Sequence, residues 1–250
     1  MNLKAFHLSL VLFVQCTKSY MAKRLSKHSI GSHFTLFRKA GSHYMSKFIQ
    51  PYLKFPDVME VDETFLGASR FNMLSNFPTI RWVFGMHCRK TKICMMYYLK
   101  DKNHNSIVPL IKRHIDTGGV LFSDMHSMYT HWHTNKSKLS AYGIYHMWTN
   151  HSEQMVHYKY RFLHTLNIER EWLHLKRKFY LITFAQSAKA IQDWCNVFTI
   201  HKSILKPECR YEFWLKMIKY YYFDLLREFR KGIPTVDTLY PSITKLEEAI

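Results

Sequence analysis

Acidic residues are absent from the first 56 positions of this chain, which contain neither aspartate nor glutamate. The same segment carries nine lysines and arginines, and the whole chain has 36 Lys and Arg against 18 Asp and Glu, a formal net charge of +18. Such a surplus exceeds what solubility requires and predicts a polyanionic partner. A basic segment on an anionic membrane is the alternative, although the long apolar stripe of such helices is lacking. We therefore expect the N-terminal fifth of the chain to face nucleic acid.

Paired cysteines are lacking as well. The five cysteines are an odd number without a Cys-x-x-Cys pair, so neither a disulfide framework nor a zinc ribbon is indicated. A zinc site built from the 16 histidines is an alternative, but no cysteine stands at ligand spacing and no His-Glu-x-x-His motif occurs. The cysteine usage fits a reducing compartment.

Long apolar runs are the third absence, since no run reaches the ~18 residues that a membrane-spanning helix requires. Residues 4–14 resemble the charged and apolar parts of a secretory signal, but no small-x-small cleavage site follows. A buried first helix is the favoured interpretation of that segment. We expect an intracellular protein without a membrane partner, in the nucleus if the source is eukaryotic and otherwise in the cytoplasm.

Proline marks the place where the composition changes. Pro51 and Pro56 precede the first acidic residue, which places a domain boundary near residue 52. Upstream, residues 17–50 have the pattern of short helices, with Ser29 as an N-cap. A helix-turn-helix whose second helix presents His33 to DNA fits this pattern, and so does any other small three-helix unit. The expected segments are a basic helical module (1–51), an α/β domain (52–205) and a C-terminal helix with a tail (206–250).

The strand predicted over residues 58–66 carries two acids on one face. With a two-residue period, Glu60 and Asp62 lie on the same side of an otherwise apolar strand. Two stacked carboxylates repel each other unless a cation or a proton lies between them. The spacing therefore favours a metal site that includes Asp62, with Glu60 and Glu63 in supporting roles.

Two further acids stand at positions typical of a site, although an isolated acid is ordinarily an exposed surface carboxylate. Asp124 ends the apolar strand predicted at 120–124, and ligands of α/β folds bind at such strand ends. Glu169 lies at the edge of the apolar stripe of the helix predicted over 164–178. Glu171 and Glu153 compete with it for the same role.

The order of the elements predicts the fold. The pattern indicates a hairpin at 81–99, a helix at 104–115, a strand at 143–148 and helices at 186–203 and 208–230. A strand with an acid, a hairpin, a helix, a strand with an acid, a strand and a helix with an acid follow one another. This is the ribonuclease-H-like arrangement, an α/β fold with a mixed sheet flanked by helices. The small helix-turn-helix-like module would precede it, and the C-terminal helices would follow it.

Five short stretches in this order resemble the DDE transposases of the Merlin group and their bacterial insertion-sequence relatives. The resemblance covers about residues 57–180. The matching stretches are Glu60-Val61-Asp62-Glu63, Trp82-Val83-Phe84-Gly85, Ser123-Asp124 with Tyr129, Asn150-His151-Ser152, and His164-Thr165-Leu166-Asn167-Ile168-Glu169 followed by Trp172 and Leu175-Lys176-Arg177.

The resemblance implies an enzyme that cleaves DNA strands and transfers them at transposon ends. It identifies Asp62, Asp124 and Glu169 as the catalytic acids and the ligands of Mg²⁺ (or Mn²⁺). Two ions about 4 Å apart can stabilise both the attacking and the leaving oxygen of a phosphodiester, and magnesium demands hard oxygen ligands. The partners would be double-stranded DNA, as transposon ends and target, and further copies of the chain on that DNA. Asn167, His164 and Lys176 would orient the third acid or contact the scissile phosphate.

Basic residues and departures from the family pattern complete the expectations. The residues expected to contact DNA are Lys23, Arg24, Lys27, His33, Arg38, Lys39 and Arg177. The chain departs from the family at Met125-His126, at His87-Cys88 and in having no zinc ribbon. A domesticated, catalytically silent DNA-binding protein derived from a transposase is therefore the alternative function.

Overall fold

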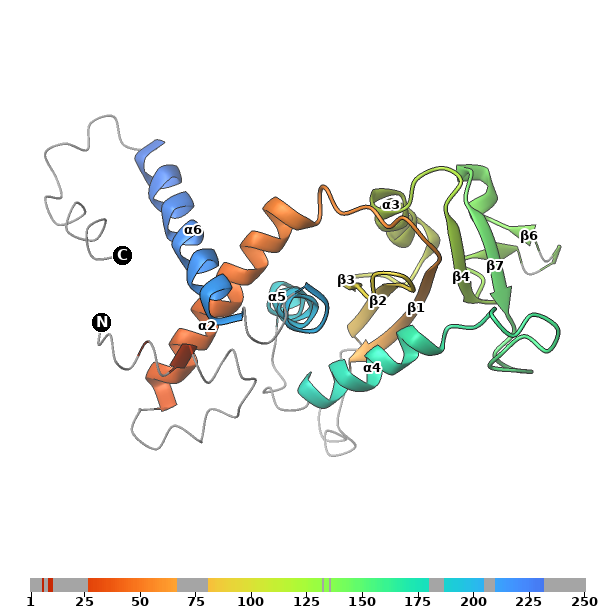
Figure 1. Cartoon of the computed structure of the whole chain (residues 1–250), viewed down its shortest axis with the longest axis horizontal. Helices are drawn as coiled ribbons and strands as arrows, with labels where there is room; N and C mark the ends of the chain where they lie inside the picture. The colour runs from red at the N-terminus through yellow and green to blue at the C-terminus, as the bar shows by residue number, and fades with distance from the viewer. Residues whose placement is uncertain are drawn as a thin grey trace, which may run out of the picture. The chain divides into compact units, whose positions relative to one another are not determined.

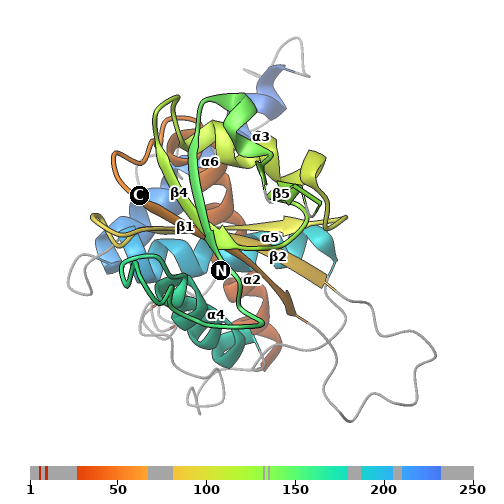
Figure 2. The same cartoon turned by 90° about the vertical axis from the view of Figure 1, so that its right-hand side faces the viewer.

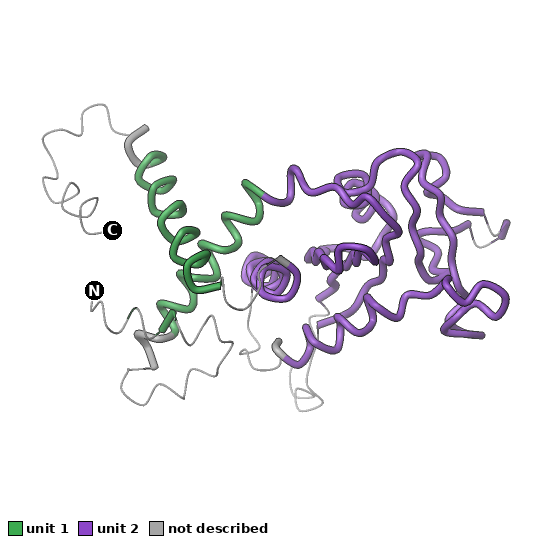
Figure 3. Tube along the Cα trace, viewed as in Figure 1, with its two compact units in different colours: residues 1–48, 205–250 green, residues 49–204 purple. Residues whose placement is uncertain are grey.

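The computed structural model describes residues 6, 9–10, 27–66, 81–131, 133–134, 136–179, 187–204 and 210–231. Contacts divide the chain into two compact units, one of residues 49–204 and one of residues 1–48 with 205–250 (Figure 3). We expected the N-terminal module and the C-terminal helix as separate segments, whereas the contacts group them in one unit. Each unit is described by itself.

The larger unit is built on a five-stranded sheet in the order β3-β2-β1-β4-β7 (Figure 1). Strand β2 runs antiparallel to its neighbours β1 and β3, and β4 and β7 run parallel to β1. This mixed sheet with flanking helices confirms the predicted ribonuclease-H-like fold class. The strands are β1 (Met59–Leu66), β2 (Arg81–Cys88), β3 (Cys94–Leu99), β4 (Val120–Asp124) and β7 (Tyr145–Thr149).

Helices cover both faces of this sheet, as Figures 1 and 2 show. One face carries α4 (Leu166–Phe179) and α5 (Ala188–Thr199), whose buried Ile168, Trp172 and Ile191 share a core with residues of β1, β2 and β3. The other face carries α3 (His104–His114), where His114 and Tyr97 of β3 form a hydrogen bond. The smaller elements are β5 (Thr130–His131), β6 (Lys136–Ser137), η3 (Leu139–Tyr142) and η4 (Ile200–Ile204).

Gly85 allows α4 to approach the sheet closely. A Cβ atom at this position of β2 would lie 2.3 Å from Cη2 of Trp172 and 2.8 Å from Cδ1 of Ile168. Real side chains do not tolerate such contacts without shifting the helix. The glycine therefore determines how closely α4, the helix that carries Glu169, packs against the sheet.

The smaller unit pairs two long helices, α2 (Lys27–Tyr44), continued by η2 (Met45–Ile49), and α6 (Arg210–Lys231). Tyr44 and Phe213 pack edge to face, and Asp224 of α6 accepts hydrogen bonds from His43 and Lys47. The predicted second helix of a helix-turn-helix lies within α2, which begins at Lys27. Residues 17–26, which would form the first helix, lie outside the described residues.

Within the part of the chain that the structure describes, no helix is long and apolar enough to cross a membrane. Of the signal-like segment 4–14, only Phe6, Ser9 and Leu10 are described, and all three are helical and buried.

Candidate active site

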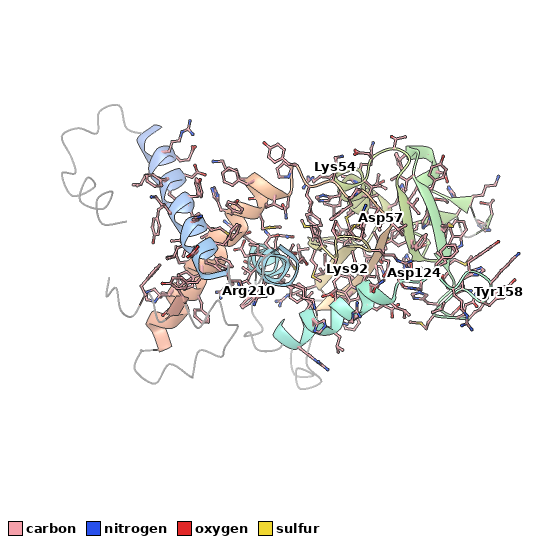
Figure 4. All side chains as sticks on the ribbon, in the orientation of Figure 1. Lys54, Asp57, Lys92, Asp124, Tyr158 and Arg210 are labelled. Carbon is pink, nitrogen blue, oxygen red and sulfur yellow. The ribbon has the colours of Figure 1, made fainter. Side chains whose placement is uncertain are left out.

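The two predicted aspartates lie on neighbouring parallel strands. The pairing of β1 with β4 ends at Glu60 and Phe122, and Asp62 and Asp124 follow two residues further along each strand. Since residues two apart on a strand share a face, both aspartates lie on the face of the sheet that α4 covers. Figure 4 labels Asp124 at the end of β4.

The third predicted acid, Glu169, lies in the first turn of α4 and its side chain is 28% exposed. Its Oε1 accepts a hydrogen bond from Oγ1 of Thr165 at 3.1 Å and lies 3.6 Å from Nδ1 of His151. Its two competitors have other surroundings, since Glu171 lies beside Lys202 and Glu153 accepts a hydrogen bond from an asparagine in an exposed loop. Glu169 is therefore the acid of α4 whose negative charge acts on Asp62, together with that of Asp124.

Burial and like charge both act on Asp62. Burial, together with the negative charges of Asp124 and Glu169, raises the pKa of its carboxyl from 3.8 to about 6. The hydrogen bond from Nε1 of Trp172 to Oδ2, 2.8 Å long, opposes this shift and lowers the pKa of Asp62. Among the described residues, neither Asp62 nor Asp124 forms an ion pair. Within the described ranges, the two aspartates thus carry negative charge without a paired cation, and Glu169 has only the imidazole of His151 beside it.

Hard carboxylate oxygens without a counter-ion are the donor set that a divalent cation prefers. No group of three or more His, Cys, Asp or Glu side chains within the described ranges is already close enough together to hold a metal ion. Joint coordination by Asp62, Asp124 and Glu169 therefore requires side-chain movements that draw the carboxylates together. The residues fit the chemistry of Mg²⁺, while the final ligand geometry would form on binding.

Glu60 anchors α4 to β1. Its fully buried carboxylate accepts hydrogen bonds from the backbone N–H groups of Asn167 and Ile168, at 2.9 and 3.2 Å, and from Nδ2 of Asn167 at 2.6 Å. Nε of Arg89 donates a fourth bond at 2.6 Å, and Nδ1 of His164 lies 3.7 Å away. A carboxylate on free N–H groups at a helix N-terminus also suits the helix dipole. Glu60 thereby holds the helix that carries the third acid.

Asn167 and His164 belong to this network. We predicted that they orient Glu169 or contact phosphate; in the metal-free structure they contact Glu60 and Arg89, Asn167 also accepts a hydrogen bond from Arg170, and the charge of Glu169 acts on His164. Arg89 was not singled out from the sequence, because an arginine in a polar hairpin turn carries no signal of a partner far along the chain.

Glu63 belongs to the opposite face of the sheet. The hydroxyl of Tyr129 donates to its Oε1, and Nζ of Lys102 lies 3.4 Å from Oε2. Burial raises the pKa of this carboxyl from 4.5 to about 8. Tyr129 thereby ties the segment that follows Asp124 to β1, and Glu63 takes the supporting position that the sequence indicated.

The remaining predicted contact residues have other described partners, are exposed, or lie outside the described residues. Lys176 stands over the ring of Phe65, with Nζ 5.2 Å from the ring centre, and Arg177 is exposed. In the helical unit, His33 packs against Phe6 and Phe37 and bonds to Ser9, Arg38 donates to Thr35, and Lys39 is exposed. Lys23 and Arg24 are not described, and Lys27 is described only as the first residue of α2.

Comparisons with known proteins identify no family. No protein-family model and no curated protein matches the chain. Among solved structures, a chain of the cryo-EM structure of the simian T-cell lymphotropic virus intasome in complex with PP2A regulatory subunit B56 gamma is similar, with a TM-score of 0.40 and 12% identity. The match covers 64% of this chain and 55% of that one.

Proposed function

We propose that this chain is a DDE transposase of the Merlin type, which cleaves DNA strands and joins them at the ends of a mobile element. The observation that carries the proposal is the position of Asp62, a half-buried carboxylate without an ion-pair partner among the described residues, on the strand beside Asp124 and within electrostatic reach of Glu169. Burying such a charge is costly unless something compensates it. Two aspartates on one face of the sheet and a glutamate on the helix that covers this face suit the binding of divalent cations, which in turn bind phosphate.

Each of the three acids would hold Mg²⁺ or Mn²⁺ from a different element. When bound, two ions would activate the attacking hydroxyl and neutralise the leaving oxygen of the phosphodiester. Trp172 fixes the orientation of Asp62 through Oδ2, and the backbone N–H of His126 donates to Oδ1 of Asp124 at 3.1 Å. Thr165 positions Oε1 of Glu169 on α4. These hydrogen bonds hold the carboxylates in the metal-free protein, from which they would move together to share an ion.

The charge of +18 supports DNA as the partner of this site. Arg177 and Lys39 are exposed and available to phosphate, one in each unit. We extend the proposal to double-stranded DNA, as transposon ends and as target, and to more than one copy of the chain on that DNA. The other basic residues named from the sequence keep their predicted role as DNA contacts.

Metal-dependent nicking of supercoiled plasmid tests this function without knowledge of the terminal sequence. Asp62→Asn, Asp124→Asn and Glu169→Gln should each abolish nicking in Mg²⁺ and in Mn²⁺ while DNA binding remains, because removing an acid reduces repulsion with phosphate. The exposed Glu153→Gln is the matched control and should nick as the parent does. Calorimetric titration with Mn²⁺ should show binding to the parent and weakened binding to the three variants.

A chain that binds DNA but neither binds Mn²⁺ nor nicks it would contradict the enzymatic proposal. That outcome would identify the chain as the catalytically silent, transposase-derived DNA-binding protein. Loss of DNA binding together with nicking in one of the variants would instead mark that acid as structural.

A further inference from the structure

The connection between β7 and α4 presents an unusual set of rings to solvent. Tyr158 is 79% exposed, Phe162 is 53% exposed and Tyr160 is 45% exposed, within a stretch of five residues. Exposed aromatic clusters of this kind are uncommon on protein surfaces unless they bind something. We refer to residues 156–162 as the aromatic loop.

The rings of the aromatic loop are already arranged as a stack. His157 lies between Tyr158 and Tyr160, with ring centres 5.1 and 5.2 Å away and interplanar angles of 17° and 27°. The ring of His157 is held by the backbone N–H of Tyr160, which donates to Nδ1 at 3.1 Å. An antiparallel bridge between Val156 and His164 closes the base of the loop. The loop can therefore offer the outer ring of Tyr158 without first ordering itself.

Positive charge alternates with these rings. Lys159 and Arg161 are both exposed, and Nζ of Lys159 stands 5.4 Å from the ring centre of Tyr160. No acid occurs between residues 154 and 168. Rings that can accept a flat partner, interleaved with cations, are the combination by which proteins bind unpaired nucleic acid strands. A duplex keeps its base faces stacked on each other and offers only phosphates to such a surface.

Both ends of the loop connection are tied to the candidate active site. β7 ends at Thr149, which pairs with Asp124, and the connection ends at Thr165, which donates to Glu169. The carbonyl of Phe162 also accepts a hydrogen bond from Nη1 of Arg89 at 2.6 Å. Figure 4 labels Tyr158 at the outer edge of the unit, beyond Asp124 in that view.

We propose that the aromatic loop binds unpaired bases of a DNA strand next to the bond that is cut, with one base stacked on Tyr158 and the neighbouring phosphates held by Lys159 and Arg161. The proposal rests on the proposed function for the identity of the strand. It adds to that function a site for frayed or single-stranded DNA, which the three acids by themselves do not require.

Binding to duplexes with and without a short 3′ overhang tests the proposal in the full chain, in EDTA, with 2-aminopurine as the overhang base. The parent should bind the overhang duplex more tightly than the blunt duplex and should quench the 2-aminopurine fluorescence. Tyr158→Ala should weaken overhang binding roughly 5- to 150-fold and abolish the quenching, the range expected for one stacked base. Blunt-duplex binding should not change. Tyr158→Phe should restore both signals, since stacking needs the ring and not the hydroxyl.

Tyr52→Ala is the matched control, because Tyr52 is 76% exposed in the same unit but lies outside the loop. It should behave as the parent. Equal overhang binding by Tyr158→Ala and the parent would overturn the proposal. So would a Tyr158→Ala chain that sediments with a changed oligomeric state and keeps its overhang binding, because the rings would then form a contact between copies.

The assay needs no metal and no cleavage, which separates the two proposals. Quenching that depends on Tyr158 in a chain that does not nick DNA would leave the stacking site standing and refute the enzymatic function. A chain that nicks DNA, but whose overhang binding does not depend on Tyr158, would support the enzymatic function and refute the stacking site.

Discussion

Replacing Asp62 with asparagine should make the metal-free protein more stable at neutral pH. Burial and the neighbouring acids raise the pKa of Asp62 from 3.8 to about 6 in the folded chain. The folded protein therefore holds this proton more tightly than the unfolded chain does, and stability is lost as the pH rises through that window. A shift of about two units corresponds to about 3 kcal/mol. Asparagine removes the charge and keeps an oxygen that can accept the hydrogen bond from Trp172.

The gain should follow the titration of Asp62. At pH 7.5 the free energy of unfolding of Asp62→Asn should exceed that of the parent by about 3 kcal/mol, a rise in Tm of roughly 6–12 °C for a chain of this size. Near pH 3, below both the unfolded value of 3.8 and the folded value of about 6, the two proteins should unfold alike, because Asp62 is then largely protonated in both states. Urea unfolding in EDTA at several pH values gives both quantities. Glu63 also titrates, with a pKa of about 8 in the folded chain, but it is present in both proteins, so most of its contribution cancels in the difference.

Mg²⁺ should remove most of this difference in stability. A cation that binds the folded parent compensates the charge of Asp62, and a ligand at 100 times its Kd adds about 2.7 kcal/mol of stability. The Asp62→Asn variant should gain less from the ion. Asp116→Asn is the control, since the side chain of Asp116 is 72% exposed, and its stability should stay within about 0.5 kcal/mol of the parent. A variant no more stable than the parent at pH 7.5, or a gain that does not change between pH 3 and 7.5, would refute the reasoning.

Three further substitutions test how α4 is held. Glu60→Gln should lower the free energy of unfolding by about 3–5 kcal/mol in urea, because it removes a fully buried carboxylate from its partly buried arginine and from the helix N–H groups, whereas the exposed Glu153→Gln should have almost no effect. Gly85→Ala should destabilise the chain by about 1–3 kcal/mol, since the new Cβ would overlap Trp172; an unchanged Tm would mean that α4 can move away freely. Trp172→Phe should raise the pKa of Asp62 above about 6, because it removes a hydrogen bond that lowers this pKa in the parent. Carbon-13 NMR of the carboxyl group measures the pKa, and a value that stays the same or falls would contradict the prediction.

Local patterns were sufficient for the elements of the larger unit. A two-residue period predicted β1 and the β2–β3 hairpin, and the apolar runs predicted β4 and β7 close to their observed bounds. The helical period predicted α3, α4 and α5 in the same way. These predictions succeed because the alternation of apolar and polar side chains is imposed by burial on one face, which a sequence records directly.

The helical parts show where local patterns stop. A helical period predicts short helices within residues 17–50 and a helix over 208–230, but neither the single helix α2 over Lys27–Tyr44 nor its packing with α6 in one unit. The ion pairs of Asp224 with His43 and Lys47 join residues far apart in the chain, and no local sequence pattern predicts them. The same holds for Arg89, whose partner Glu60 is reached only after the hairpin has folded back on β1.

The sequence by itself determined the ribonuclease-H-like order of strands and helices. It also placed one acid on the first strand, one at the end of the fourth strand and one at the start of the helix that follows the sheet. Only the tertiary structure decided which carboxylates carry compensated charge and which do not. Glu60 and Asp62 are two residues apart on one face of β1, yet Glu60 contacts an arginine and the start of α4, while Asp62 contacts Trp172 and pairs with no cation in the part of the chain that the structure describes. The stack of rings in the aromatic loop depends likewise on the bridge that closes it. Charge and stacking act over a few ångströms, and those distances are set by how the strands and helices pack, not by spacing along the chain.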